Sequence, residues 1–313
     1  MGSRPEVASA VVLILSRADV EALVSPEALL DAVSGALQAL SSGAFSAPPR
    51  QSVDAERGAV LTMAGRRANS PVVVKLVGVF PGNVGLGLEP HPAVVALFDA
   101  TTGACLALMD GEHITGLRTA AAAALSTRAL AREDASVLAV VGSGVQARAH
   151  LRMLPLVRSF ASIRVVARDP AAAARLGCDA GTIEGADVIC LTTSASSPVV
   201  SVDDVAPGTH VTSVGFAPPG GELDPALARA GRLFVETRQA FEPPPAGCAE
   251  LAGLDPAAGT ELGAVLAGRA PGRTSPSEIT VYKAMGHVAE DAAAAELVYR
   301  AALDAGAGTH VDL

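Results

Sequence analysis

Lysine is rare in this chain, and its two lysines are therefore candidates for chemistry. Of the 23 basic residues only Lys75 and Lys283 are lysines, and the others are arginines. An ammonium group can change its pKa and transfer a proton, whereas a guanidinium group stays charged. Lys75 lies within the apolar residues 72–77, where burial lowers a lysine pKa toward the range useful for acid–base catalysis. We interpret Lys75 as catalytic, the alternative being a snorkelling or salt-bridged side chain.

Two arginines are candidates for binding a small carboxylate together with Lys75. Arg50 follows two prolines, and Arg118 lies at the expected start of a helix, where two lobes of the chain should meet. A guanidinium fork binds a carboxylate through two parallel hydrogen bonds. The hypothesis is that Arg50, Lys75 and Arg118 converge on one cleft.

A glycine-rich turn is the candidate cofactor site. The segment Gly142-Ser143-Gly144-Val145-Gln146-Ala147 fits the pattern GxGxxG/A, although a chain this rich in glycine and alanine contains about one such match by chance. The match directly follows the apolar residues 137–141 and opens a helical segment. Glycines at Gly142 and Gly144 would let the backbone approach a pyrophosphate at a helix N-terminus. We therefore predict a dinucleotide site, the alternative being a tight turn that binds nothing.

The end of the next strand bears on the choice of nucleotide. An acidic residue there would bind the ribose hydroxyl of NAD. Here the strand ends in alanine, and Arg168 and Asp169 follow. Arg168 is suited to a 2′-phosphate, so NADP(H) is favoured as the cofactor. NAD(H) stays open because of Asp169, and Arg168 could instead be a solvated surface charge.

The elements before residue 115 predict an α+β lobe. Residues 11–15 read as a strand, and Ser25-Pro26-Glu27 is typical of a helix start, with apolar residues at helical spacing up to Gly43. Residues 59–63 and 71–80 are β-rich. Residues 94–99 and 104–110 predict a hairpin. Together they indicate one helix on a mixed or antiparallel sheet.

The second half of the chain alternates strands and helices. After an alanine-rich helix at residues 119–131, strands are expected at residues 136–141, 163–167, 188–192, 210–215, 233–236 and 279–282. This alternation predicts an α/β fold with a Rossmann-type, doubly wound parallel sheet. Residues 170–185 leave almost no room for another strand, so that edge should be short. A last amphipathic helix is expected at residues 291–303.

Composition excludes several classes of protein. The 313 residues carry a formal charge of −9 and contain no basic stretch interleaved with aromatics, so we expect no nucleic-acid partner. Mean hydropathy is +0.40, but no apolar run approaches the roughly 20 residues that span a membrane. Residues 1–7 show no secretory signal, and we expect a cytoplasmic protein. The four cysteines lie far apart, which predicts reduced thiols and no metal site.

Motifs along almost the whole chain resemble those of the ornithine cyclodeaminase/mu-crystallin family. The ordered set is far more specific than the glycine turn alone. It consists of Lys75, Phe80-Pro81-Gly82-Asn83, Gly87-Leu88, Leu97-Phe98-Asp99, Thr102-Gly103, Asp110-Gly111, Thr115, Arg118-Thr119-Ala120-Ala121, Gly142-Ser143-Gly144-Val145-Gln146, Ala186-Asp187-Val188-Ile189, Pro207-Gly208-Thr209-His210-Val211, Val214-Gly215 and Glu222-Leu223-Asp224.

The resemblance implies a homodimeric NAD(P)-dependent enzyme. Residues 1–118 with 285–313 would form the substrate-binding and dimerisation lobe, and residues 119–284 the Rossmann domain. Carried over by position, it places Arg50, Lys75 and Arg118 around a substrate carboxylate. It places Val145, Gln146, Thr193 and Val214 near the nucleotide.

One departure separates the activities found in the family. Ornithine cyclodeaminases carry an aspartate shortly after the Val-Gly step, but here Val214-Gly215 is followed by Phe216-Ala217-Pro218-Pro219. Asp224 is interpreted as structural. The leading hypothesis is a ketimine reductase or amino acid dehydrogenase that acts on the C–N bond of a small α-imino or α-amino acid. The alternatives are ornithine cyclodeaminase, with internally recycled NAD, and a non-catalytic protein that binds NADPH or another ligand.

Overall fold

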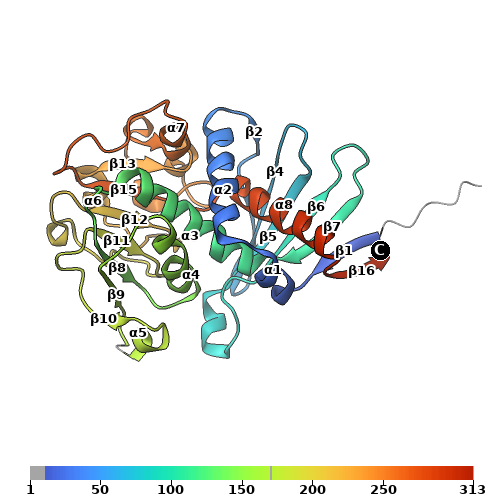
Figure 1. Cartoon of the computed structure of the whole chain (residues 1–313), viewed down its shortest axis with the longest axis horizontal. Helices are drawn as coiled ribbons and strands as arrows, with labels where there is room; N and C mark the ends of the chain where they lie inside the picture. The colour runs from blue at the N-terminus through green and yellow to red at the C-terminus, as the bar shows by residue number, and fades with distance from the viewer. Residues whose placement is uncertain (1–10, 170, 313) are drawn as a thin grey trace, which may run out of the picture.

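Two β-sheets joined by a group of helices make up the computed structural model, which describes residues 11–169 and 171–312 (Figure 1). Residues 1–7, where the sequence shows no secretory signal, lie outside the described residues. Within the described ranges, no helix is both long enough and apolar enough to cross a membrane.

The first sheet is mixed, as the sequence predicts. Its strand order is β16-β1-β7-β6-β5-β4-β2, with β3 paired to β4. Among the described strands of this sheet, β1 and β7 run parallel and the other pairs are antiparallel. The predicted hairpin is present, and the C-terminal strand, which the sequence did not reveal, pairs with β1. The strands are β1 (Val11–Leu15), β2 (Phe45–Ser46), β3 (Gln51–Ala55), β4 (Gly58–Arg67), β5 (Val72–Val79), β6 (Ala93–Phe98), β7 (Cys105–Asp110) and β16 (Thr309–Asp312).

The second sheet confirms the predicted Rossmann-type fold. Its strands are all parallel in the order β10-β9-β8-β11-β12-β15-β13-β14. The short edge does hold one more strand, because the two-residue β10 fits after α5. The strands are β8 (Val137–Val141), β9 (Ser162–Val166), β10 (Asp179–Ala180), β11 (Val188–Leu191), β12 (His210–Ser213), β13 (Arg232–Val235), β14 (Thr260–Glu261) and β15 (Thr280–Lys283).

Helices α3 and α8 pack on β5 and β6 of the first sheet, and α2 packs on both helices (Figure 1). Leu29, Leu37, Leu125 and Val298 are fully buried where these helices meet. The α-helices are α1 (Arg17–Leu23), α2 (Pro26–Ser41), α3 (Gly111–Leu130), α4 (Val145–Met153), α5 (Ala171–Arg175), α6 (Pro225–Ala230), α7 (Leu262–Leu266) and α8 (Val288–Ala305). Short 3-10 helices are η1 (Pro81–Leu86), η2 (Leu154–Leu156), η3 (Val202–Asp204), η4 (Arg238–Phe241), η5 (Ala249–Leu251) and η6 (Pro256–Ala258).

Side-chain caps explain where several helices begin. Ser25 accepts a hydrogen bond from the Ala28 amide and Pro26 is the first helical residue, as predicted for α2. Asp224 caps α6, which confirms its structural role. Helix α3 begins at Gly111, eight residues before the predicted start, because Asp110 accepts from the His113 amide. His287 likewise starts α8 three residues earlier than predicted.

The earlier start of α3 bears on the division into domains. This helix crosses residue 118 without a break and packs against β5 and β6 of one sheet and β12 and β15 of the other. The boundaries at residues 118 and 285 therefore stay a prediction.

Candidate active site

A buried carboxylate joins two of the three predicted substrate-binding residues. Lys75 points from β5 to the face that α3 and α8 cover, and its side chain is 1% exposed. Its Nζ lies 2.8 Å from Asp291 Oδ1 and 2.6 Å from Thr115 Oγ1. Arg118 Nε donates to the same Asp291 oxygen at 3.0 Å. The structure thus brings Lys75 and Arg118 together on Asp291.

Burial and neighbouring charges shift the pKa values of Lys75 and Asp291. Burial lowers the pKa of Lys75 to about 8, although Asp291 opposes the shift. Burial alone would raise the pKa of Asp291, but Arg118 and Lys75 hold it below its usual value. Lys75 is therefore a lysine that can release a proton only slightly above neutral pH.

Two further acids surround Arg118. Glu290 Oε2 accepts from Arg118 Nη1 at 2.7 Å. Glu236, at the end of β13, accepts from the amides of Met285 and Gly286. Burial and then the charge of Glu236 raise the pKa of Glu290 well above its ordinary value, which favours its protonated form.

Arg50 is the third predicted substrate-binding residue. Its Nε donates to the Pro245 carbonyl and its Nη1 to the Met285 carbonyl at 3.3 Å. Its guanidinium carbon lies 4.7 Å from the centre of the Phe216 ring. Arg50 Nη2 is buried and has no hydrogen-bond partner among the described residues. Arg50 therefore makes no direct contact with Asp291 here, but it holds a donor that a ligand could use.

The glycine turn has the features that a pyrophosphate needs. Gly142 has φ +126°, and a Cβ there would lie 2.6 Å from Thr192 Oγ1. Gly144 is the N-cap residue of α4 and has no side chain to occupy the first-turn amides. Gln146 Oε1 is buried without a hydrogen-bond partner in residues 11–169 and 171–312. These residues fit a dinucleotide phosphate at the start of α4.

Helix α3 connects the cationic group to the glycine turn. A Cβ on Gly116 would lie 3.3 Å from Val145 Cγ1, at the start of α4. The neighbouring Thr115 contacts Lys75, and Arg118 contacts Asp291. Residues 115–118 of α3 therefore contact Lys75, Asp291 and Val145.

The other predicted nucleotide residues lie at the carboxyl edge of the second sheet. Thr193 and Val214 follow β11 and β12, and the backbone amide of each donates to Glu222. Arg168 follows β9; its side chain is exposed and forms neither a hydrogen bond nor an ion pair within the described part of the chain. Asp169 pairs with Arg175 at 2.7 Å.

Sequence reasoning missed the buried acids. Glu290 and Asp291 form an acidic pair in an otherwise apolar helix start, and this pattern could have indicated buried partners for Lys75. Glu236 ends a parallel strand, where polar residues face the ligand edge. Glu222 lies within a motif that was noted, but its contacts, to residues 213–215 and to Thr193, were not predicted.

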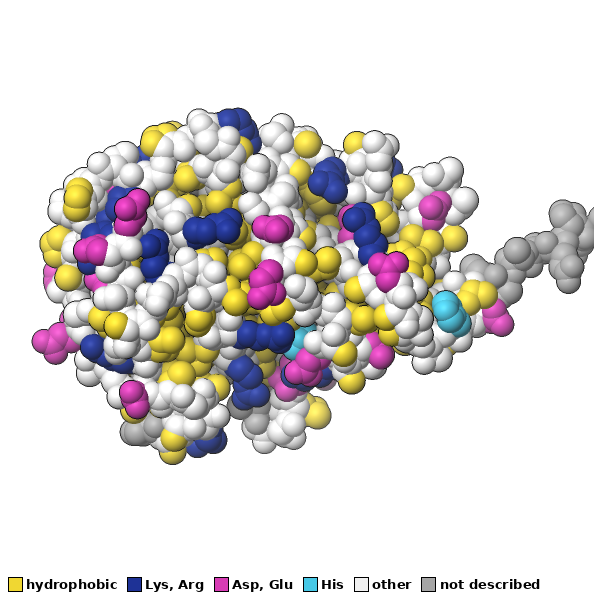
Figure 2. Space-filling view, viewed as in Figure 1, with side chains coloured by type: hydrophobic (Ala, Val, Ile, Leu, Met, Phe, Trp, Pro, Cys, Tyr) yellow, Lys and Arg dark blue, Asp and Glu magenta, His cyan; other side chains and the backbone are white. Residues whose placement is uncertain are grey.

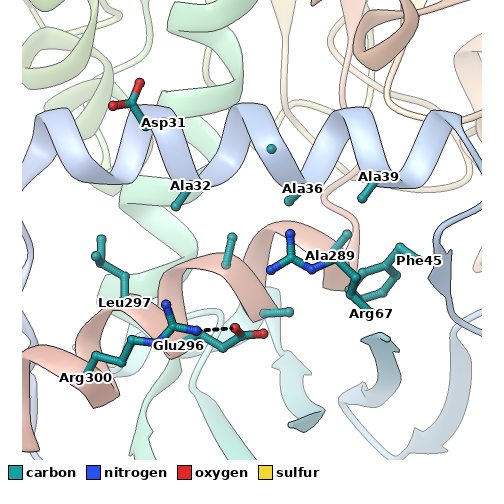
Figure 3. Close-up of a pocket in the computed structure, with 13 residues that line it drawn as sticks. Asp31, Ala32, Ala36, Ala39, Phe45, Arg67, Ala289, Glu296, Leu297 and Arg300 are labelled. Carbon is teal, nitrogen blue, oxygen red and sulfur yellow. Dashed lines mark hydrogen bonds and ion pairs between the residues drawn. The ribbon is translucent and has the colours of Figure 1, made fainter. Parts of the chain in front are cut away.

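A separate cavity of about 270 Å³ lies between α2 and α8 (Figure 3). Six of its 13 lining residues are alanines, and Asp31, Arg67, Glu296 and Arg300 are also among them. Glu296 already accepts hydrogen bonds from Arg300 and Ser70. The cavity includes none of the predicted site residues.

The surface and the remaining polar groups add little to the site. Acidic and basic side chains are interspersed on the face that Figure 2 shows. The described residues contain no group of three His, Cys, Asp or Glu side chains arranged to hold a metal ion, and the four cysteines are free thiols.

Comparison with known proteins identifies similar chains. The family model described as the ornithine cyclodeaminase/mu-crystallin family matches residues 10–306. Ketimine reductase mu-crystallin of Mus musculus is 35% identical over 244 residues, covering 74% of this chain and 76% of that protein.

Solved structures show the same fold. The structure of Thermococcus litoralis Δ1-pyrroline-2-carboxylate reductase with NADH and L-proline has a TM-score of 0.88 and 32% identity, covering 96% of this chain and 100% of that chain. An archaeal alanine dehydrogenase dimer with bound NAD has a TM-score of 0.87 and 28% identity, covering 96% and 99%.

The pKa of Lys75 can be measured directly because the chain has two lysines. Lysine labelled with 13C at Cε should give two side-chain signals, which Lys75→Arg assigns. We expect the Lys75 signal to titrate with a midpoint of about 8. Asp291→Asn removes a negative charge that favours the protonated form, so the midpoint should fall further. A midpoint near the ordinary value of 10.5 in the unsubstituted protein would contradict this account.

Proposed function

The chain belongs to the ornithine cyclodeaminase/mu-crystallin family, and on this premise we propose that it is an NAD(P)-dependent oxidoreductase acting on the C–N bond of a small α-imino or α-amino acid. The observation that carries the proposal is the pair of buried cations, Lys75 and Arg118, next to the glycine turn. Relatives named for ketimine reduction, pyrroline-2-carboxylate reduction and alanine dehydrogenation support the reaction class.

Arg50, Lys75 and Arg118 bind the substrate carboxylate in this proposal. Arg118 contacts Asp291 and Glu290, and burial together with the charge of Glu236 raises the pKa of Glu290. The three cations would attract a substrate carboxylate. Arg50 Nη2, buried without a partner among the described residues, supplies a donor for it.

Lys75 acts on the substrate nitrogen. When bound, a reduced nicotinamide supplies the hydride for the substrate carbon. Thr115 and Asp291 hold Lys75 Nζ in place, and the pKa of about 8 lets Lys75 either donate a proton to the nitrogen or stabilise charge there. Helix α3, on which Thr115 lies, keeps this nitrogen site close to Val145 of the glycine turn.

The residues after the Val-Gly step favour a reductase or dehydrogenase over a cyclodeaminase. Residues 216–221, which follow the Val-Gly step, contain no acid to serve a second amine. Phe216 instead stacks against Arg50. The absence of an acid in this segment favours substrates whose side chain carries no amine.

We expect purified protein to oxidise NADPH with cyclic ketimines, or with 2-oxo acids and ammonia or methylamine. Lys75→Met should lower kcat/KM by at least about 100-fold and leave NADPH affinity within a few-fold. Lys75→Arg keeps the charge but transfers no proton, so activity in this variant would favour the electrostatic role. Absorbance at 340 nm follows the reaction. Formation of proline from ornithine without any absorbance change would instead establish the cyclodeaminase.

NADP(H) is the proposed cofactor. Gly142, Gly144, Val145 and Gln146 hold the pyrophosphate in this proposal, with Thr193 and Val214 near the nicotinamide. Arg168 is exposed and available for a 2′-phosphate, whereas Asp169 is engaged by Arg175. The solved relatives carry NADH or NAD, so the proposed preference for NADP(H) rests on Arg168.

Arg168→Ala tests the nucleotide preference. Loss of one charge-assisted hydrogen bond should lower the ratio of kcat/KM with NADPH to that with NADH by about tenfold. Arg229→Ala on α6 removes an exposed arginine elsewhere in the same domain and should leave the ratio unchanged. A ratio that favours NADH in the unsubstituted protein would contradict the proposal.

A homodimer through the outer face of the first sheet is also proposed. Val53, Val60, Leu76 and Val94 lie on one face of β3, β4, β5 and β6, and their side chains are 36–66% exposed. Such a contiguous apolar face on a sheet is typical of an interface. The archaeal relative is a dimer, which supports a second copy of this chain as the occupant.

Placing charges on this face should separate the subunits. We expect Leu76→Lys combined with Val94→Lys to give a folded monomer by light scattering and circular dichroism, because buried unpaired lysines are costly. Leu303→Lys, at an exposed leucine of α8, should remain dimeric. A dimer that survives both sheet substitutions would place the interface elsewhere.

A further inference from the structure

The second lysine, Lys283, is as buried as the first and has no role in the proposed chemistry. It ends β15, and its side chain is 0% exposed. Its Nζ donates to Glu250 Oε1 at 2.7 Å, to the Gly215 carbonyl at 2.7 Å and to Ser213 Oγ at 3.2 Å. An ammonium has three N–H donors, and all three are used. The contacts with Ser213 and Gly215 hold the end of β12 and the turn that follows it.

Glu222 holds the same turn from the other side. One of its oxygens accepts from the amides of Val214 at 3.0 Å and Gly215 at 2.6 Å, and from Ser213 Oγ at 3.1 Å. Its other oxygen accepts from the Thr193 amide and hydroxyl at 2.6 and 2.8 Å. The Glu222 carboxylate therefore links the ends of β11 and β12, while Lys283 holds the Gly215 carbonyl.

The space around the turn is filled. A Cβ on Gly215 would lie 2.5 Å from the Thr193 carbonyl oxygen and 2.7 Å from Glu222 Cδ. A Cβ on Gly221 would lie 1.9 Å from Glu250 Oε1. Close packing and buried charge contacts therefore hold both ends of residues 215–221 in place.

We propose that Lys283, together with Glu250 and Glu222, is a positioning residue that fixes the Val214–Gly215 turn against the nicotinamide end of the cofactor. The inference rests on the proposed cofactor site. The turn lies at the carboxyl edge of a parallel sheet, where dinucleotides bind, beside Thr193. Errors of about 1 Å in such a position cost about 100-fold in rate, which makes a rigid turn valuable.

The test compares two variants with a matched control. Lys283→Met removes the ammonium but leaves Glu250 buried and unpaired. Lys283→Met combined with Glu250→Gln is neutral and keeps the fold testable if the single variant is unstable. Arg132→Met is the control, because Arg132 pairs with Asp187 at 2.6 Å at the opposite, amino edge of the same sheet.

Binding separates a positioning role from a merely structural one. NADPH and 2′-phospho-ADP-ribose, which lacks the nicotinamide, are titrated into each protein. The chain has no tryptophan, so nicotinamide fluorescence is read without indole emission. In both Lys283 variants we expect the Kd of NADPH to rise about tenfold and that of 2′-phospho-ADP-ribose to change less than about twofold. The emission of bound NADPH should also shift toward that of free NADPH.

Other outcomes of the titrations would overturn the inference or the cofactor site. Equal weakening of both ligands, or no change in either, would overturn the inference, as would the same selective loss in Arg132→Met. Failure of the unsubstituted protein to bind 2′-phospho-ADP-ribose, NADPH and NADH would overturn the proposed cofactor site and this inference with it. Binding of both ligands by the unsubstituted protein leaves the proposed function standing whichever way the variants behave.

Discussion

The shared contact of Lys75 and Arg118 with Asp291 is the interaction on which the rest of the structure depends. It joins β5, α3 and α8, three elements far apart in the sequence, through one carboxylate that is fully buried. A buried charge without its partner is costly, so these elements have little freedom to move separately. The C-terminal helix is therefore as much a part of the site as the strand that carries the lysine.

Both lysine side chains are buried, but their hydrogen-bond partners suit them to different roles. Lys75 is held by one carboxylate and one hydroxyl, and burial brings its pKa to about 8, which suits proton transfer. Lys283 donates all three of its N–H groups, to a carboxylate, a carbonyl and a hydroxyl, which suits a positioning role. Each stands on a different sheet, and α3 lies between them. A planar guanidinium differs from an ammonium in donor geometry and transfers no proton.

The sequence predicted the features that depend on residues close together in the chain. The alternation of strands and helices predicted the Rossmann-type sheet, the glycines predicted the turn before α4, and the rarity of lysine pointed to Lys75. The acidic pair Glu290-Asp291 was a signal for buried acids, but the sequence does not show that they contact Lys75, which lies 216 residues from Asp291. The predicted starts of α3 and α8 were also too late, since the caps at Asp110 and His287 were overlooked, and so Glu290 was left outside its helix.

A crystal structure with NADP⁺ and L-proline would test the central claim most directly. The account predicts the amino acid carboxylate within hydrogen-bond distance of Arg50, Lys75 and Arg118, with Lys75 still paired to Asp291 and the nicotinamide against the Val214–Gly215 turn. A carboxylate bound away from all three cations, or a cofactor that does not reach the turn, would contradict it.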